Sequence, residues 1–263
     1  MMKRFLTGLT LVCLLAACGR SGTADGPPPL RVGMELSYPP FEMTDPQGEP
    51  AGVSVDLANA LGAALGRKVE IRNIAFDGLI PELKTGRIDL ILSSMTETPE
   101  RAQSIDFSDP YVHTGLALLA GKGVRISSVG DLNRPDRRVA VKNGTTGQLY
   151  ARDHLPQAQV LVFDSEEAAV LEVAQGKADA FIYDPMSVLR NAARHADTTR
   201  AILKPFQKEA WAIGLRKGDD ALRAQVNTFL HDYRAQGGFD ALGEKYLHEE
   251  KEAFRNQGIP FVF

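Results

Sequence analysis

The chain has 263 residues, with 30 Lys and Arg against 33 Asp and Glu, and a formal net charge of −3. A mildly acidic balance without a basic run argues against nucleic acid as a partner. The sequence holds two cysteines and shows no Cys/His cluster with zinc spacing, no phosphate-binding glycine loop and no nucleophile elbow. We therefore expect no metal and no cofactor.

Residues 1–17 have the composition of a secretory signal peptide. Two basic residues precede thirteen uncharged ones, 5–17, a run shorter than the roughly 20 residues that span a bilayer. The run ends in Leu15-Ala16-Ala17-Cys18, which resembles a bacterial lipobox. That resemblance implies acylation of Cys18, followed by a Gly/Ser/Pro-rich flexible tether over 18–29. An ordinary signal peptide, with Cys18 incidental, is the alternative.

Removing 1–17 leaves 246 residues, and the net charge becomes −5 because only Lys3 and Arg4 are lost. Cys18 would then be the only cysteine, so no intrachain disulfide can form. This length can bury one or two hydrophobic cores. We expect a protein of the periplasm or cell envelope that is held to the membrane by lipid, since acyl chains on Cys18 would provide stable anchoring.

The first half of the remaining chain alternates strands with helices. We expect strands at 30–34, 69–74 and 88–92, with a helix N-capped by Ser54 and another from about Gly78 between them. This order implies parallel strands joined by helical crossovers.

A further helix is expected to begin near Arg101, because Thr98 suits the N-cap and Pro99 the first helical position. A cation in the first turn opposes the helix dipole. A ligand carboxylate bound to Arg101 would compensate for the unfavourable interaction with the helix dipole. The alternative is that Arg101 is an ordinary solvated arginine on the helix surface. The polar residues Ser93, Ser94 and Thr96 at the preceding strand end favour a binding site.

The second half repeats the same alternation. We expect strands at 116–120, 139–141, 159–163, 179–183 and 211–215, and two closing helices, at 219–236 and from 239. A polar loop, 142–147, precedes a helix start and is either an anion site or a capped turn. Chain crossings near 120 and 205 would then give lobe 1 (30–120 plus 205–263) and lobe 2 (121–204).

One unit occurs in both halves. Residues 83–92 and 173–183 each read as a helix end, a glycine suited to a left-handed conformation, a basic residue, an aspartate and a buried strand. Arg101 follows the first copy and Asp184 the second. Two similar α/β lobes would thus present one cation and one anion from corresponding strand ends. A zwitterion such as an amino acid fits that arrangement.

Several motifs together resemble those of solute-binding protein family 3, the periplasmic polar-amino-acid-binding proteins of ABC importers. These are Tyr38–Glu42, Val53–Ala58, Phe76–Pro81, Ser94–Arg101, Asp106–Tyr111 and Gly144–Gly147, over about residues 30–250. The resemblance implies a type II periplasmic-binding-protein fold: two α/β lobes, two hinge strands and a ligand cleft.

The resemblance also implies roles for individual residues. Arg101 would grip the α-carboxylate and Asp184 the α-ammonium of the ligand. The remaining ligand-binding residues it implies are Glu35, Tyr38, Phe76, Ser93, Ser94, Met95, Thr96, Lys142, Thr145 and Thr146. Tyr38 and Phe76 would sandwich the ligand side chain or serve in packing.

Glu35 and Lys142 do not decide which side chain the ligand has. They either pair across the cleft, which favours a neutral polar amino acid, or contact the ligand separately, in which case Glu35 suits a basic one. We expect a monomer that binds an L-amino acid and delivers it to a membrane permease, without catalysis. The alternatives are a dehydratase acting on prephenate or arogenate, with Glu35, Glu42 or Asp184 as acid, and a sensing subunit of a membrane receptor.

Overall fold

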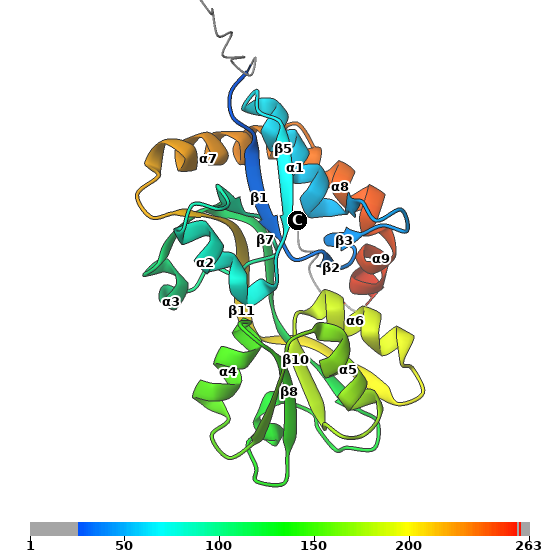
Figure 1. The fold of residues 1–263 in the computed structure, drawn as a ribbon. Helices are drawn as coiled ribbons and strands as arrows, with labels where there is room; N and C mark the ends of the chain where they lie inside the picture. The colour runs from blue at the N-terminus through cyan, green and yellow to red at the C-terminus, as the bar shows by residue number, and fades with distance from the viewer. Residues whose placement is uncertain (1–25, 257, 259–263) are drawn as a thin grey trace, which may run out of the picture.

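The computed structural model describes residues 26–256 and residue 258, and it has two lobes, one above the other in Figure 1. The expected signal peptide and Cys18 lie outside the described residues. Two long strands run through both lobes: β7 (Ile105–Gly121) and β11 (Thr199–Arg216). They pair antiparallel over most of their length, with a register shift between Ile202 and Gln207.

The first lobe surrounds three parallel-paired strands. β1 pairs with β5 on one side and β6 on the other. Its elements are β1 (Leu30–Met34), α1 (Val53–Ala64), β5 (Val69–Asn73), α2 (Leu79–Lys84), β6 (Leu90–Ile91), α3 (Pro99–Ala102), α7 (Asp220–Ala235), α8 (Gly238–Tyr246) and α9 (His248–Asn256). A small antiparallel sheet is added by β2 (Ser37–Tyr38), β3 (Glu42–Thr44) and β4 (Pro50–Ala51).

The second lobe repeats this parallel pattern. β8 pairs parallel with β9 and with β10. Its elements are β8 (Arg138–Lys142), α4 (Thr146–His154), β9 (Gln159–Phe163), α5 (Glu166–Ala174), β10 (Ala180–Tyr183) and α6 (Pro185–Arg194). Because β7 and β11 are shared, all these strands form one sheet in the order β5-β1-β6-β11-β7-β10-β8-β9. The predicted parallel strands and mixed α/β class are confirmed.

The observed elements differ from those expected in four places. The strands expected at 116–120 and 211–215 are only parts of β7 and β11. A third closing helix, α9, follows α8. The first helix is N-capped by Gly52, not Ser54. Gly52 has φ 117°, and a β-carbon there would lie 2.4 Å from the Phe41 carbonyl oxygen, so this entry to α1 requires glycine.

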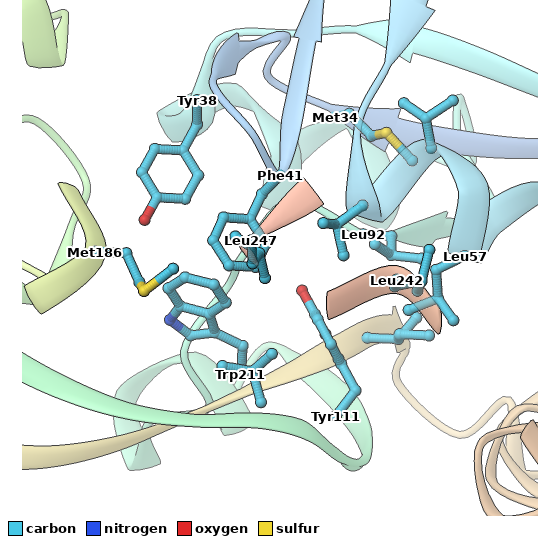
Figure 2. Packing of buried hydrophobic residues seen from close by; sticks show 14 of the residues in the cluster. Met34, Tyr38, Phe41, Leu57, Leu92, Tyr111, Met186, Trp211, Leu242 and Leu247 are labelled. Carbon is cyan, nitrogen blue, oxygen red and sulfur yellow. The ribbon is translucent and has the colours of Figure 1, made fainter. Parts of the chain in front are cut away.

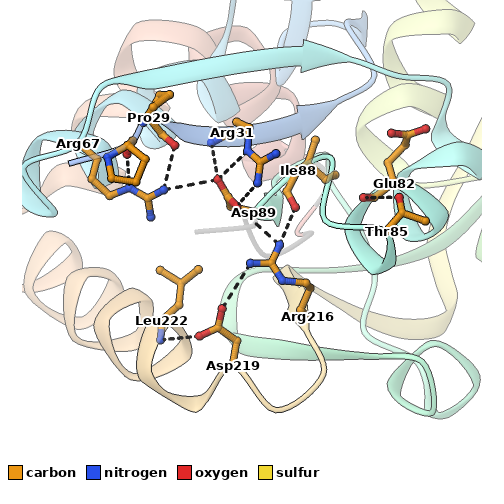
Figure 3. A network of polar contacts seen from close by, with 11 residues as sticks. Pro29, Arg31, Arg67, Glu82, Thr85, Ile88, Asp89, Arg216, Asp219 and Leu222 are labelled. Atoms are coloured by element: carbon orange, nitrogen blue, oxygen red, sulfur yellow. Dashed lines mark hydrogen bonds and ion pairs between the residues drawn. The ribbon is translucent and has the colours of Figure 1, made fainter. Parts of the chain in front are cut away.

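The repeated unit has the same local structure in both lobes. Gly86 and Gly176 have φ of 73° and 70°. Asp89 accepts from the backbone N–H of Arg31 at 3.0 Å, and Asp179 from that of Arg138 at 2.8 Å. Each aspartate therefore joins its strand to the first strand of its lobe, and Figure 3 shows the first-lobe copy.

The two copies differ in their further ion pairs. Asp89 also pairs with Arg67 and Arg216. Burial opposes ionisation of Asp89, but the hydrogen bonds from Arg31 outweigh burial and lower the pKa of this carboxyl. Asp89 is thus a structural charge at the strand start, the end opposite the expected site.

An aromatic cluster fills the first lobe beside the small sheet (Figure 2). Tyr38 stacks on Phe41 with ring centroids 5.5 Å apart, and Trp211 meets Phe41 edge-on at 5.0 Å. Burying a side chain of this size contributes about 1.5–3 kcal/mol to folding. The cluster fixes Trp211, on β11, where this strand passes between the lobes.

Candidate ligand-binding site

A cavity of about 40 Å³ lies between the lobes. Seven predicted site residues line it: Phe76, Ser94, Thr96, Arg101, Thr145, Thr146 and Asp184. Five further residues also line it: Leu116, Gly147, Tyr183, Glu209 and Trp211. A larger hollow of about 820 Å³ between α1 and α7 has a single charged side chain in its lining, Asp232. In the smaller cavity, opposite charges from the two lobes line one space, Arg101 from the first and Asp184 from the second.

Arg101 takes the position that its local sequence predicts. Thr98 caps α3 and accepts from the backbone N–H of Arg101 at 3.1 Å, and Pro99 opens the helix. The Arg101 side chain is 7 % exposed, and burial lowers the pKa of its guanidinium to about 10. Arg101 therefore remains a cation at neutral pH.

The guanidinium reaches across the cleft. Nη1 donates to the Thr96 carbonyl oxygen at 2.6 Å, and Nη2 donates to the Gly144 carbonyl oxygen of the second lobe at 2.9 Å. Its Cζ lies 5.5 Å from the ring centroid of Phe76. Within the described residues Arg101 forms no salt bridge, so its hydrogen-bond partners there are neutral.

Asp184 ends β10 and caps α6. Its Oδ1 accepts from the backbone N–H groups of Met186 at 2.9 Å and Ser187 at 3.1 Å. Pro185 at the first helical position fixes the turn into the helix. Burial raises the pKa of the Asp184 carboxyl to about 6. The cavity thus has a buried anion from the second lobe and a buried cation from the first.

The start of α4 closes another side of the cavity. Thr145 is its N-cap, and the Thr145 hydroxyl donates to the Lys142 carbonyl oxygen at 2.7 Å. A β-carbon on Gly147 would lie 2.6 Å from the Ile182 carbonyl oxygen, so the helix packs directly on β10. First-turn N–H groups of such a helix favour an anion.

Glu35 and Lys142 form an ion pair across the cleft. The Lys142 side chain is 2 % exposed, and Nζ lies 5.6 Å from the Phe76 ring centroid. The backbone N–H of Glu35 donates to Ser93 Oγ at 3.0 Å. Of the two arrangements left open by the sequence, the structure has the paired one, and neither residue lines the cavity.

Ser94 is held by a buried carboxyl group. It has φ 48°, a left-handed conformation that costs a non-glycine residue about 1–3 kcal/mol. Its hydroxyl donates to Glu42 Oε2 at 3.2 Å, and that of Ser54 donates to the same oxygen at 2.6 Å. Glu42 is 1 % exposed, and burial raises its pKa to about 8. Glu42 therefore positions the strand end behind the cavity.

Besides Glu35 and Lys142, three predicted site residues lie outside the cavity lining. Tyr38 belongs to the aromatic cluster, 5.9 Å from the ring of Tyr183. Met95 packs in an apolar cluster with Leu79 and Ile105, and Ser93 lies behind the cavity, next to Glu35.

Some of the unpredicted lining residues could have been found from the sequence. Gly147 and Tyr183 are next to predicted site residues, so the motifs that indicated those residues also indicate these two. Leu116, Glu209 and Trp211 come from β7 and β11, whose passage between the lobes places them there.

Further contacts join the rims of the cleft. Asn143 Nδ2 donates to Asp77 Oδ2 at 3.1 Å, and Arg152 pairs with Glu100 at 3.4 Å. Together with the Arg101–Gly144 hydrogen bond they hold the lobes in a closed arrangement. Within residues 26–256 and 258, no helix has the length and apolar character needed to cross a membrane, and no group of three acidic, His or Cys side chains is arranged for a metal ion.

Two lobes, two shared strands and a charged cavity between them define a type II periplasmic-binding-protein fold. The model of the bacterial extracellular solute-binding proteins, family 3, matches residues 30–249, and the chain belongs to this family. Family membership implies a place in the periplasm or cell envelope.

Two known relatives match 83% and 95% of the chain. An L-arginine-binding protein of Pseudomonas aeruginosa is 33% identical over 83% of this chain and 88% of its own length. A probable histidine-binding protein of Neisseria gonorrhoeae is 31% identical over 95% of this chain and 97% of its own length. Among solved structures, an ancestral amino-acid-binding protein described as a precursor of cyclohexadienyl dehydratase is similar, with a TM-score of 0.76. It is 40% identical in sequence, and the match covers 82% of this chain and 94% of that chain.

Proposed function

We propose that this protein binds an L-amino acid between its lobes and delivers it to the permease of an ABC importer. The observation that carries the proposal is the placement of Arg101 and Asp184, two buried and opposite charges from different lobes, in the lining of one cavity. Relatives named for arginine and histidine binding support the same ligand class.

The charges assign the ends of the ligand. Arg101 would take the α-carboxylate, since guanidinium and carboxylate form two parallel, charge-assisted hydrogen bonds. Ser94, Thr96 and the α4 start would add donors. Asp184 would take the α-ammonium. Burying either ligand charge without a partner is unfavourable, so the ligand favours the state in which both lobes contact it, and this difference in affinity drives closure.

The proposal includes two bodies that move relative to each other when the ligand binds. Residues 30–120 with 205–263 would move as one body against 121–204, with β7 and β11 bending between them. Hinge closure of this kind needs only a few residues to change their backbone angles. We infer that the protein acts as a monomer.

The ligand side chain would extend past Phe76 toward the Glu35–Lys142 pair. With the pair intact, the site presents little net charge there and suits a neutral polar side chain. If Lys142 moved away, Glu35 would take a basic one. Binding of L-glutamine against L-arginine separates these two cases.

We infer that binding, not catalysis, is the function. Prephenate carries two carboxylates and no ammonium, so Asp184 opposite Arg101 suits it poorly. The similarity to a dehydratase precursor makes prephenate and arogenate necessary members of the test panel.

We also propose that Cys18 is lipidated after removal of 1–17, which would anchor the protein to the membrane. The lipobox-like residues 15–18 and the tether composition of 18–29 support this. Cys18→Ser should move the protein from the membrane fraction to the soluble fraction. Retention of this variant in the membrane fraction would contradict lipidation.

The test of the proposed function is calorimetric titration of the domain from Leu30, unfolded and refolded to remove carried-over ligand. The panel holds the common L-amino acids, prephenate and arogenate. We expect tight binding of one or a few amino acids, abolished by Arg101→Ala and by Asp184→Ala. Turnover of prephenate or arogenate without amino-acid binding would overturn the proposal.

A further inference from the structure

Glu209 is a second buried carboxylate in the cavity. It lies on β11 and is 9 % exposed. Trp211, two positions along the strand, lines the cavity with it, because alternate residues of a strand face the same side. Nothing in the local sequence sets Glu209 apart; its place follows from the passage of β11 between the lobes.

The side-chain hydrogen bonds of Glu209 come from neutral groups. Oε2 accepts from the Thr96 hydroxyl at 3.0 Å, and Oε1 accepts from Gln207 Nε2 at 3.0 Å. Arg101 is close enough to be attracted by the charge of Glu209, which partly offsets the effect of burial on the Arg101 pKa, but among the described residues no Lys or Arg forms a salt bridge with Glu209. A buried carboxylate without a direct ion pair is costly, so the site favours a further cation beside Glu209 once Arg101 holds the α-carboxylate.

Thr96 shows which end of the ligand this carboxylate faces. Its carbonyl oxygen accepts from Arg101 Nη1, while its hydroxyl donates to Glu209. Glu209 therefore lies at the Arg101 end of the cavity. The Glu35–Lys142 pair, where the ligand side chain would point, is outside the lining. The group nearest Glu209 would be an α-substituent of the ligand.

A charge count points to the same group. Among the lining residues, Arg101 is the one cation, and Asp184 and Glu209 are two anions. An α-carboxylate on Arg101 leaves both anions facing the rest of the ligand's α-carbon. The α-ammonium is the cation available there.

We propose that Glu209 is a ligand-binding residue that accepts the α-ammonium together with Asp184. This inference rests on the proposed amino-acid-binding function. The ammonium would then be held by the second lobe through Asp184 and by a strand common to both lobes through Glu209. A ligand without an ammonium would leave two carboxylates in the lining of one closed cavity without a cation from the ligand.

The test is Glu209→Gln, which keeps the size of the side chain and an oxygen that can accept from Thr96. It is titrated with L-arginine and L-glutamine, which have similar lengths and differ in side-chain charge, and with any other L-amino acid that the wild type binds. We expect affinity to fall by a similar factor for each bound amino acid, about tenfold to hundredfold, the range for a hydrogen bond to a charged group. Glu167→Gln is the matched control, because Glu167 is exposed on α5 and lies outside the cavity lining.

A double-mutant cycle with Asp184→Asn supplies the second readout. Two groups that hold one ammonium are coupled, so the combined loss should differ from the product of the single losses. Unchanged affinity in a folded Glu209→Gln variant, a loss confined to basic amino acids, or strict additivity with Asp184→Asn would each overturn the assignment. A wild type that binds no amino acid would instead overturn the proposed function, and the inference with it.

Discussion

Lys142 of the second lobe and Glu35 of the first form an ion pair across the cleft, and the lysine side chain is 2 % exposed. Each lobe thereby supplies the partner of a charge that closure buries. The pair makes closure dependent on matched charges beside the ligand site as well as on the ligand itself.

This pairing predicts that losing one partner is worse than losing both. In Glu35→Gln, closure buries Lys142 without its carboxylate, and breaking a buried pair costs about 3–5 kcal/mol. We expect strongly weakened binding of the best-bound amino acid, and partial recovery in Glu35→Gln/Lys142→Met. Calorimetry of the wild type, the two single variants and the double variant measures the coupling. Equal affinities of the single Glu35 variant and the double variant would argue against it.

The raised pKa of Asp184 predicts a pH dependence of ligand affinity. Burial brings this pKa to about 6, and the ligand's ammonium stays protonated over the acidic range. As pH falls through 6, Asp184 becomes neutral in the unbound protein and the ion pair with the ammonium is lost. Affinity should then fall by up to about tenfold per pH unit, since one pKa unit is about 1.4 kcal/mol.

The matched variant for this pH dependence is Asp184→Asn. It should bind weakly at every pH and lack the fall near pH 6, because it has no carboxyl group to protonate. A wild-type affinity that is constant from pH 7 to 4.5 would refute the assignment of this carboxylate.

Glu42 predicts a pH dependence of folding stability. Its pKa is raised from 4.5 to about 8 by burial, so between these values the folded state holds a proton that the unfolded state lacks. Stability must therefore decrease as pH rises through this window, by up to about 1.4 kcal/mol per pH unit from this group. In Glu42→Gln this contribution disappears, and the free energy of unfolding should depend less on pH between 5 and 8. Urea titrations of both proteins at several pH values measure the difference.

The contact between α4 and β10 predicts that Gly147→Ala is destabilising. The added methyl group would lie 2.6 Å from a backbone oxygen, and such overpacking costs roughly 1–3 kcal/mol. Because Thr145 and Thr146 move with the helix start, ligand affinity should fall as well. Gly123→Ala is the control, since a β-carbon there meets nothing within 4 Å. Equal stability of the two variants in thermal unfolding would contradict the close packing.

The position of Arg101 at the start of α3 could be predicted from the local sequence. Thr98, Pro99 and Arg101 lie within one helix turn, so their arrangement depends on capping rules alone. The same is true of Gly86 and Gly176, whose left-handed conformations follow from the helix ends that they close.

Glu209 and Trp211 could not be found in that way. The positions of both residues depend on the pairing of β11 with β7, whose paired residues are about a hundred positions apart in the sequence. They also depend on where β11 passes between the lobes, and no turn residues in the sequence indicate that point. Periodicity described 211–215 as a short strand, and nothing local showed that its N-terminal extension enters the cleft. Ser54 differed for a related reason, because its hydroxyl binds the distant Glu42 instead of capping its helix.

The proposed function requires that one ligand carries both charges that bridge the lobes. The most direct measurement is calorimetry of the refolded domain with the best-bound L-amino acid and two analogues, one lacking the α-ammonium and one lacking the α-carboxylate. We expect that the amino acid alone binds tightly and that each analogue loses at least about a hundredfold in affinity, the equivalent of about 2.7 kcal/mol. An analogue that binds as tightly as the amino acid would contradict the assignment of Arg101 and Asp184 to the two ends of a zwitterion.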